Sequence, residues 1–234
     1  MSEQGMKILA EKKLLPGLTK VSLSFCEHCV TSKQHRLKFS TSNSRSKVIL
    51  ELVHSDVWQA LVISLEGAKY FVSFIDDYSR RFWVYPIKSK AYVFSVFKAR
   101  VALESEKKIK CLRTYNGGEY TGDVFNQFVE GIKRQFTTSY TPQQNRVAER
   151  MNKTLSERTR EMLGAASLEK KLWAEAVNTA CYVINRSPST AIELKTPMEM
   201  WTGKPVYYSD LHIFGSPVYV MYNNQETTKL YPKS

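Results

Sequence analysis

The chain has 234 residues, of which 43% are hydrophobic, and this suffices for one sizeable domain with a buried core and small appendages. Its 34 Lys and Arg residues against 22 Asp and Glu give a formal net charge of +12, which favours nucleic acid over a membrane surface as a partner, with a merely soluble basic protein as the alternative. The apolar runs are too short for a membrane span and the charged N-terminus has no apolar signal core, so we expect an intracellular chain or an internal piece of a longer one.

The N-terminal stretch predicts one helix, one cysteine pair and a linker. A helix is expected over residues 3–15, where a Pro-Gly pair ends it. Cys26 and Cys29 then form a CxxC pair ahead of a basic stretch. The Ser- and Asn-rich segment over 40–48 is typical of a linker.

The rest of the chain predicts a sheet and its covering helices. Three strands are expected over 50–58, 70–75 and 81–87, and the short turns between them favour an antiparallel meander. The later elements are a helix over 90–107, a strand over 109–114, a helix over 122–131, a strand over 133–138, and helices over 143–163 and 168–184. This order predicts an α/β domain whose mixed five-stranded sheet is covered by helices on both faces.

Two carboxylates lie where such a fold can bring them together. Asp56 ends the first strand and Glu149 lies in the first turns of the long helix. Mg²⁺ is held by a few carboxylates and substrate phosphates, and two such ions can promote phosphoryl transfer. From position alone, ordinary solvated charges are the alternative interpretation.

Six short segments carry a resemblance to a known family. They are HSDVW at 54–58, FIDDYSR at 74–80, LRTYNGGEY at 112–120, YTPQQN at 140–145, AERMN at 148–152 and INRSP at 184–188. In order and wording they resemble the integrase region of copia-type LTR retrotransposon Pol polyproteins. The resemblance covers nearly the whole chain.

The resemblance implies an RNase H-like core that carries out DNA integration. Such an enzyme trims the ends of the element's cDNA and joins the 3′ hydroxyls to target DNA. Three carboxylates, in the order Asp, Asp, Glu, hold two Mg²⁺ or Mn²⁺ ions in this family. Asp56 matches the first of these catalytic and metal-binding residues, and Glu149 matches the third.

Tyr115 stands where the resemblance places the second Asp. A phenol is neutral at pH 7, with a reference pKa of about 10, so it cannot bridge two cations as a carboxylate does. The segment between Tyr115 and Glu149 is also two residues shorter than the family pattern, with the loss near 128–131. Further departures are Arg146 in place of the usual Gly and Gln59-Ala60 in place of Gly-Pro. We therefore expect an integrase by descent whose catalysis is impaired.

The zinc motif is incomplete. The family's N-terminal module binds Zn²⁺ through two His and two Cys, and Cys26 and Cys29 match the Cys pair. The His pair would lie upstream of Met1, and structural zinc normally needs four ligands. We expect two thiols rather than a stable zinc site. The isolated Cys111 and Cys181 are expected to be buried, because four cysteines in this spacing make no disulfide framework.

The long helix is also the expected nucleic-acid surface. Arg146, Arg150 and Lys153 accompany Glu149, and in the family DNA approaches this helix, so phosphate contacts are expected. A solvated helix face is the alternative. The neighbouring strand-end acids Asp76-Asp77 are interpreted as partners of the two following arginines.

The resemblance also implies partners and a division of the chain. The partners would be cDNA ends, target DNA, the rest of the Pol polyprotein and further integrase copies, in the nucleus. The expected parts are a truncated zinc-binding module over 1–39, a linker over 40–48, the catalytic core over 49–190 and a post-core extension over 191–234. Three hypotheses remain open: an active polynucleotidyl transferase, a non-catalytic DNA-binding relic, and a decayed reading frame with no selected role.

Overall fold

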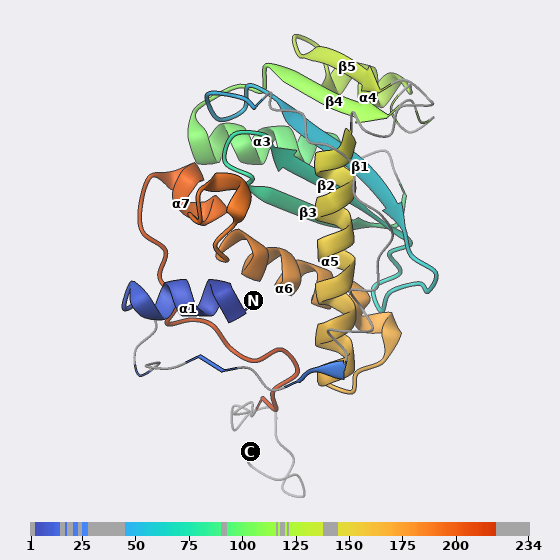
Figure 1. Ribbon diagram of the computed structural model, residues 1–234. Coiled ribbons are helices and arrows are strands. Elements are labelled where there is room, and N and C mark those ends of the chain that lie inside the picture. Colours follow the sequence, from blue (N-terminus) through green and yellow to red (C-terminus); the bar gives the residue numbers. More distant parts are fainter. Residues whose placement is uncertain are drawn as a thin grey trace, which may run out of the picture.

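The computed structural model describes residues 3–14, 17, 21–22, 25–27, 45–89, 93–115, 117, 120, 122–137 and 145–218. Its centre is a five-stranded sheet of order β3-β2-β1-β4-β5 (Figure 1). The strands are β1 (Val53–Gln59), β2 (Tyr70–Asp76), β3 (Phe82–Ile87), β4 (Cys111–Tyr115) and β5 (Lys133–Thr137). The first three pair antiparallel, whereas β4 pairs parallel with both β1 and β5. The predicted mixed sheet is confirmed, and β1 lies at its centre.

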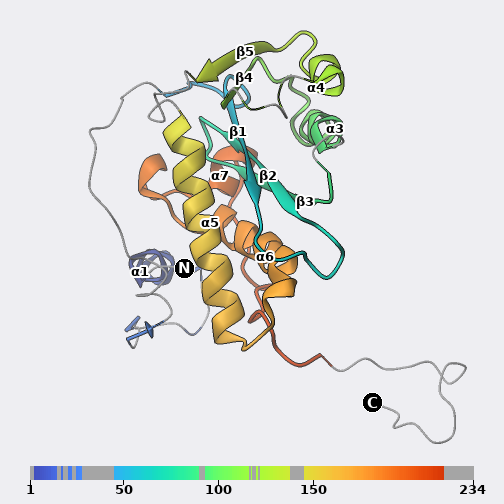
Figure 2. The same cartoon turned by 90° about the vertical axis from the view of Figure 1, so that its right-hand side faces the viewer.

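Helices cover both faces of this sheet (Figure 2). One face carries α3 (Val93–Ser105) and α4 (Asp123–Phe128), and the other carries α5 (Arg146–Ala165) and α6 (Trp173–Asn185), with the short turn η3 (Lys170–Leu172) ahead of α6. Each layer has its own core. None of the helices in the described ranges is long and apolar enough to cross a membrane.

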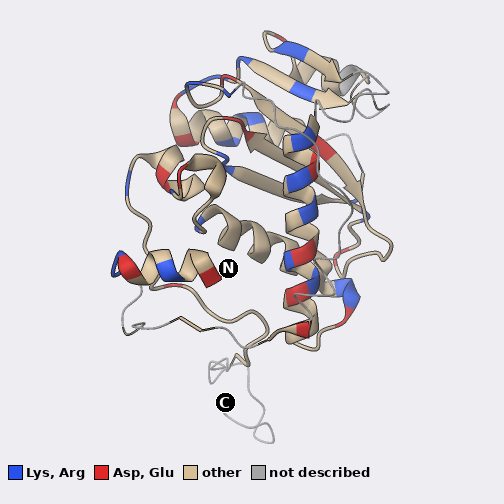
Figure 3. Cartoon of the chain, viewed as in Figure 1, with Lys and Arg blue, Asp and Glu red and all other residues tan. Residues whose placement is uncertain are grey.

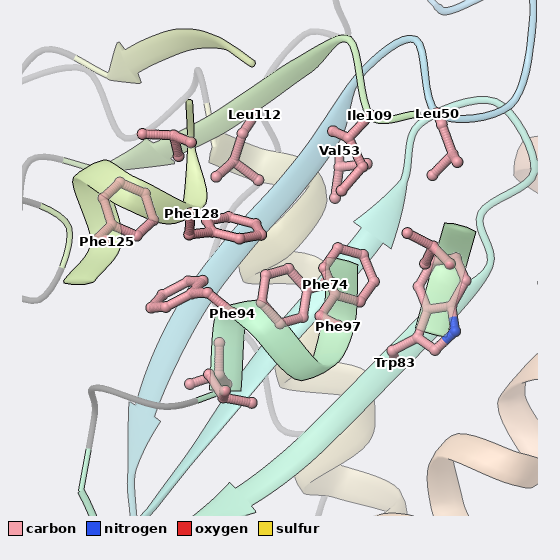
Figure 4. Packing of buried hydrophobic residues seen from close by; sticks show 14 of the residues in the cluster. Leu50, Val53, Phe74, Trp83, Phe94, Phe97, Ile109, Leu112, Phe125 and Phe128 are labelled. Atoms are coloured by element: carbon pink, nitrogen blue, oxygen red, sulfur yellow. The ribbon is translucent and has the colours of Figure 1, made fainter. Parts of the chain in front are cut away.

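The core between the sheet and α3 is built largely from aromatic rings (Figure 4). Phe74 of β2 stacks on Phe97 of α3 with ring centroids 3.8 Å apart and planes 7° apart. Phe94 packs edge-on against Phe74, at 5.7 Å. Fully burying one such side chain contributes about 1.5–3 kcal/mol, so this layer fixes the position of α3 against the sheet.

The first strand and helix α6 begin later than the sequence predicts. The first strand begins at Val53 rather than at residue 50, because Leu50 adopts a positive φ of 61° and its N–H donates to the Asp76 carboxylate at 2.7 Å. Helix α6 begins at Trp173 rather than at residue 168, because the separate turn η3 occupies Lys170–Leu172.

The N-terminal helix and the residues after the core pack together. Helix α1 (Glu3–Glu11) is shorter than predicted, and it buries Leu9 against Val206 and Tyr208. These two follow α7 (Pro197–Thr202), whose start has Thr196 as its N-cap. A nine-residue helix is marginal in water on its own, so this contact accounts for α1.

Candidate active site

Asp56 and Tyr115 lie on neighbouring strands of the sheet, β1 and β4. Strands β1 and β4 run parallel with Val53 opposite Leu112 and His54 opposite Arg113. The same offset brings Asp56 of β1 level with Tyr115, the last residue of β4. The sheet therefore places these two predicted site residues on neighbouring strands.

Asn152 of α5 ties the long helix to Asp56. Its buried amide donates to one carboxylate oxygen of Asp56 at 2.8 Å, and the Val57 N–H donates to the other at 2.9 Å. Glu149 lies three residues earlier on α5, and residues three apart share one side of a helix. The structure therefore puts Glu149 on the side of α5 that meets Asp56, one turn nearer the start of the helix.

Glu149 and Asp56 differ in their surroundings. Glu149 is exposed as a residue, although partial burial of its carboxyl raises its pKa above the ordinary value. Asp56 is half-buried and engaged by the two N–H donors. The pair thus offers one constrained carboxylate and one that reaches toward solvent.

The Tyr115 ring belongs to the edge of the aromatic core. It is half-buried and packs edge-to-face on Tyr120, with ring centroids 5.5 Å apart. Tyr120 is fully buried, and its hydroxyl lies 3.2 Å from the hydroxyl of Ser55. Tyr115 therefore supplies apolar packing to this core, whereas the family pattern has a second carboxylate at this position.

The residues present do not fit a two-cation site. Within the described ranges, no group of three or more His, Cys, Asp or Glu side chains could hold a metal ion. Asn152, which donates to the Asp56 carboxylate, is uncharged, and so is Tyr115 at the position of the second acid. Hard cations such as Mg²⁺ require oxygen ligands with enough negative charge to replace water, and this arrangement has one carboxylate fewer than the expected three.

The two acids at the end of β2, Asp76 and Asp77, make hydrogen bonds and an ion pair within the fold. The Asp77 carboxylate lies 3.0 Å from the His54 ring nitrogen and accepts from Arg80 at 3.0 Å. Burial alone would raise the pKa of Asp77, but the hydrogen bonds from His54 and the Ser46 N–H, with the Arg80 charge, hold it well below its usual range. The interpretation of Asp77 as a partner of Arg80 is confirmed.

The same interpretation was wrong for Arg81. Its guanidinium lies 5.5 Å from the centre of the Trp83 ring and 4.0 Å from Glu104. Asp76 instead accepts from the N–H and hydroxyl of Ser79 at 2.7 and 2.6 Å, and burial raises its pKa. The Arg81 side chain therefore lies near Trp83 and Glu104 rather than near the acids after β2. The spacing of these residues in the sequence does not reveal this.

The predicted nucleic-acid residues lie on the N-terminal half of α5. Arg150 and Lys153 are exposed and Arg146 is half-buried. Figure 3 shows Lys and Arg predominating along this half of α5, while acidic and basic residues mix further down. There Arg158 pairs with Glu161 at 2.7 Å. The basic surface thus begins beside Glu149, and its role in phosphate contact stays a prediction.

The zinc prediction stays open, because Cys29 lies outside the described residues. Cys26 is exposed, and Cys111 and Cys181 are buried as expected. The sequence reasoning missed Asn152 as a site residue. Its signal was its place three residues after Glu149 in the segment AERMN, which allows both side chains to face the sheet.

The sequence comparisons found transposon relatives. No family model matches the chain. It is 47% identical over 240 residues to the "Retrovirus-related Pol polyprotein from transposon TNT 1-94" of Nicotiana tabacum, covering 100% of this chain and 18% of the relative. It is 33% identical over 214 residues to the corresponding polyprotein from transposon RE2 of Arabidopsis thaliana, covering 89% of this chain and 15% of the relative. The chain thus spans less than a fifth of the length of these relatives.

Solved structures share the fold at low sequence identity. The HTLV-2 integrase catalytic core domain in complex with magnesium superposes with a TM-score of 0.53 at 18% identity, covering 67% of this chain and 99% of that one. A chain of the simian T-cell lymphotropic virus intasome in complex with the PP2A regulatory subunit B56 gamma superposes with a TM-score of 0.57 at 16% identity, covering 82% of this chain and 66% of that one. The expected RNase H-like architecture is therefore confirmed.

Proposed function

Because this chain is a region of a copia-type retrotransposon Pol polyprotein with the fold of the retroviral integrase catalytic core, we propose that it is an integrase-type DNA-binding domain whose strand-transfer chemistry is disabled at Tyr115. The observation that carries the proposal is the register of β1 and β4. Continued by two residues, this register sets Tyr115 of β4 opposite Asp56 of β1, at the position where the family pattern has an acid.

The charge at the site supports the loss of catalysis. Asp56 lies on β1 and Glu149 on α5, while the second acid of the family pattern is replaced by the Tyr115 ring, which packs on Tyr120. A carboxylate in that place would add the negative charge that two cations need. Without it, the site would have two of the three carboxylates that hold the ions in the family pattern, so end processing and strand transfer would lack a metal ligand.

The basic half of α5 supports DNA binding. Arg150 and Lys153 are exposed beside Glu149, and the whole chain carries a formal charge of +12. Such a surface attracts phosphates without reading sequence. The proposed partners are the cDNA ends of the element and target DNA, bound as part of a larger Pol polyprotein.

A strand-transfer assay with Mg²⁺ or Mn²⁺ on short duplex ends tests the chemistry. We expect no product above the level of an Asp56→Ala control. The Tyr115→Asp variant should then gain metal-dependent activity that a second substitution, Asp56→Ala, removes. Product from the parent chain above the control would refute the proposed disablement. Failure of Tyr115→Asp to gain activity would locate the defect in the shortened segment before α5 as well.

A second candidate, a fully active integrase, is favoured by one observation. Asn152 still holds the Asp56 carboxylate and keeps Glu149 on the side of α5 that faces the sheet. The same assay decides between the two. Retained DNA binding without product, in a chain that is expressed, distinguishes a DNA-binding relic from a decayed reading frame.

A further inference from the structure

An apolar cavity of about 540 Å³ opens along the C-terminal half of α5. Its wall begins at Trp58, two residues beyond Asp56 on β1, and continues over Leu163 of α5 to Trp173 of α6. The cavity shares no residue with the Asp56 site. Its volume lies within the range of roughly 300–1,000 Å³ that is usual for binding sites.

The floor of the cavity is aromatic. Trp58 stacks on Phe71 of β2 with ring centroids 5.0 Å apart and planes 22° apart, and Trp173 meets Trp58 edge-on at 6.1 Å. Trp58 nevertheless remains 37% exposed. Aromatic rings that are partly solvated and held by neighbouring rings can bury a large apolar group with little loss of conformational entropy.

The loop between β1 and β2 extends this apolar surface beyond the cavity mouth. Leu61 is fully exposed, and Ile63 and Leu65 are 55% and 62% exposed. The loop is fixed on the start of α6, because the Trp173 indole N–H donates to the Val62 carbonyl and the Leu65 N–H donates to the Lys171 carbonyl, both at 2.9 Å. Its exposed side chains are therefore presented on a fixed frame.

The charged side chains that line the cavity have one sign. Among the described residues that line it, both charged side chains are cationic, namely Arg160 of α5 and Lys170 of η3. Carboxylates of a partner would be attracted to this rim and would be favoured over ammonium groups.

We propose that this cavity and the Leu61–Leu65 loop form a docking site for a short peptide of a partner protein, with one large apolar side chain flanked by carboxylates. The cavity accepts the apolar side chain, Arg160 and Lys170 meet the carboxylates, and the exposed loop covers the rest of the peptide. Exposed apolar surface of this kind marks protein contacts. A peptide fits better than nucleic acid, because phosphates against Leu61 and Ile63 would lose hydration without gaining partners.

Binding of labelled dodecapeptides to the full chain, followed by fluorescence polarisation, tests the proposal. The first probe carries Leu, Phe and several Glu residues, the second replaces Glu by Lys, and a single-stranded 12-mer oligonucleotide is the third. We expect the acidic peptide to bind with a Kd on the order of 10 μM, and the Lys peptide to bind at least tenfold more weakly. Competition by the oligonucleotide at this site would overturn the proposal in favour of a nucleic-acid pocket.

Substitutions locate the site. Ser156 is a half-buried lining residue, so Ser156→Trp should fill the cavity and abolish binding, while Ser156→Ala should bind like the parent. Reversing both charges, Arg160→Glu with Lys170→Glu, should weaken the acidic peptide by about tenfold or more. The matched control, Lys107→Glu with Lys108→Glu beyond the end of α3, should leave the affinity unchanged.

Two measurements keep the test independent of folding and self-association. Leu61→Ser with Ile63→Ser alters only exposed positions and should also weaken the peptide several-fold. Unchanged affinity in this variant or in the charge reversal would overturn the proposal. Sedimentation of the parent chain that shows a dimer dispersed by Leu61→Ser with Ile63→Ser would assign the surface to a second copy instead. The peptide affinities of the parent and of these variants do not depend on strand transfer or on DNA binding at α5, so their failure is distinguishable from failure of the proposed function.

Discussion

The hydrogen bond between Asn152 and Asp56 is a single contact that joins the long helix to the central strand. Asn152 is buried, and its amide is 2.8 Å from the carboxylate. A buried hydrogen bond to a charged group contributes more than one between neutral groups. This contact therefore orients α5, and with it Glu149, whether or not the site is catalytic.

Replacing Asn152 by Ala should lower the free energy of unfolding by about 1–2 kcal/mol, because the Asp56 carboxylate loses a donor. The measurement is urea denaturation followed by circular dichroism. The exposed Asn178 of α6 provides the control, and Asn178→Ala should change stability by no more than about 0.5 kcal/mol. Equal changes in the two variants would show that the Asn152 contact contributes nothing.

The cysteines should differ in reactivity with pH. Burial raises the pKa of the Cys181 thiol to about 12, and the thiolate is the reactive form. Raising the pH from 7 to 9 should therefore speed alkylation of the exposed Cys26 by iodoacetamide and leave Cys181 unmodified. Mass spectrometry of the peptides checks this. In urea, where the reference thiol pKa of about 8.5 applies, both should react, and modification of native Cys181 would contradict its burial.

At the scale of elements, a short turn joins α4 to β5. Helix α4 has six residues, and the turn that follows it places Gly131 at a φ of +76° before β5 begins. Positive φ favours glycine because a Cβ atom meets the neighbouring carbonyl. The segment that is shorter than the family pattern thus depends on one glycine to re-enter the sheet.

Gly131→Ala should destabilise the chain by about 1–2 kcal/mol through this backbone conformation alone. Nothing lies within 4 Å of the added Cβ, so steric crowding plays no part. Gly122 is the matched control, since its φ is −71° and its added Cβ also meets nothing. Gly122→Ala should stay within about 0.5 kcal/mol of the parent in urea denaturation. A similar loss in both variants would rule out the proposed role of the Gly131 conformation.

At the scale of the whole molecule, the charge excess should govern DNA affinity. The logarithm of the binding constant falls linearly with the logarithm of salt concentration, by about 0.9 per phosphate contact on duplex DNA. Arg150→Ala and Lys153→Ala should each lower this slope by about that amount. Lys107→Ala, an exposed change on the other face of the sheet, should not. A slope of zero for the parent chain would refute phosphate contacts.

The fold was largely predictable from sequence, and the site only in part. Alternating and β-branched runs located all five strands, because side chains that pack on a sheet must follow its period. The turn at Leu50 was missed, since it depends on a hydrogen bond to Asp76 from a distant part of the chain. The Asn152 contact was missed for the same reason, because only the approach of α5 to β1 creates it.

The order of strands in the sheet also sets an order of assembly. The meander β1-β2-β3 joins strands that are close in sequence, whereas β4 must return across the chain to pair with β1, and β5 then pairs with β4. Pairing of strands that are distant in sequence loses the conformational entropy of the chain between them, and this loss opposes the pairing until further contacts offset it. The antiparallel strands β1, β2 and β3 can therefore pair during folding before β4 joins them. Until then, the edge of β1 that later pairs with β4 has no strand beside it. The pairing that brings Tyr115 beside Asp56 is then among the last steps of folding.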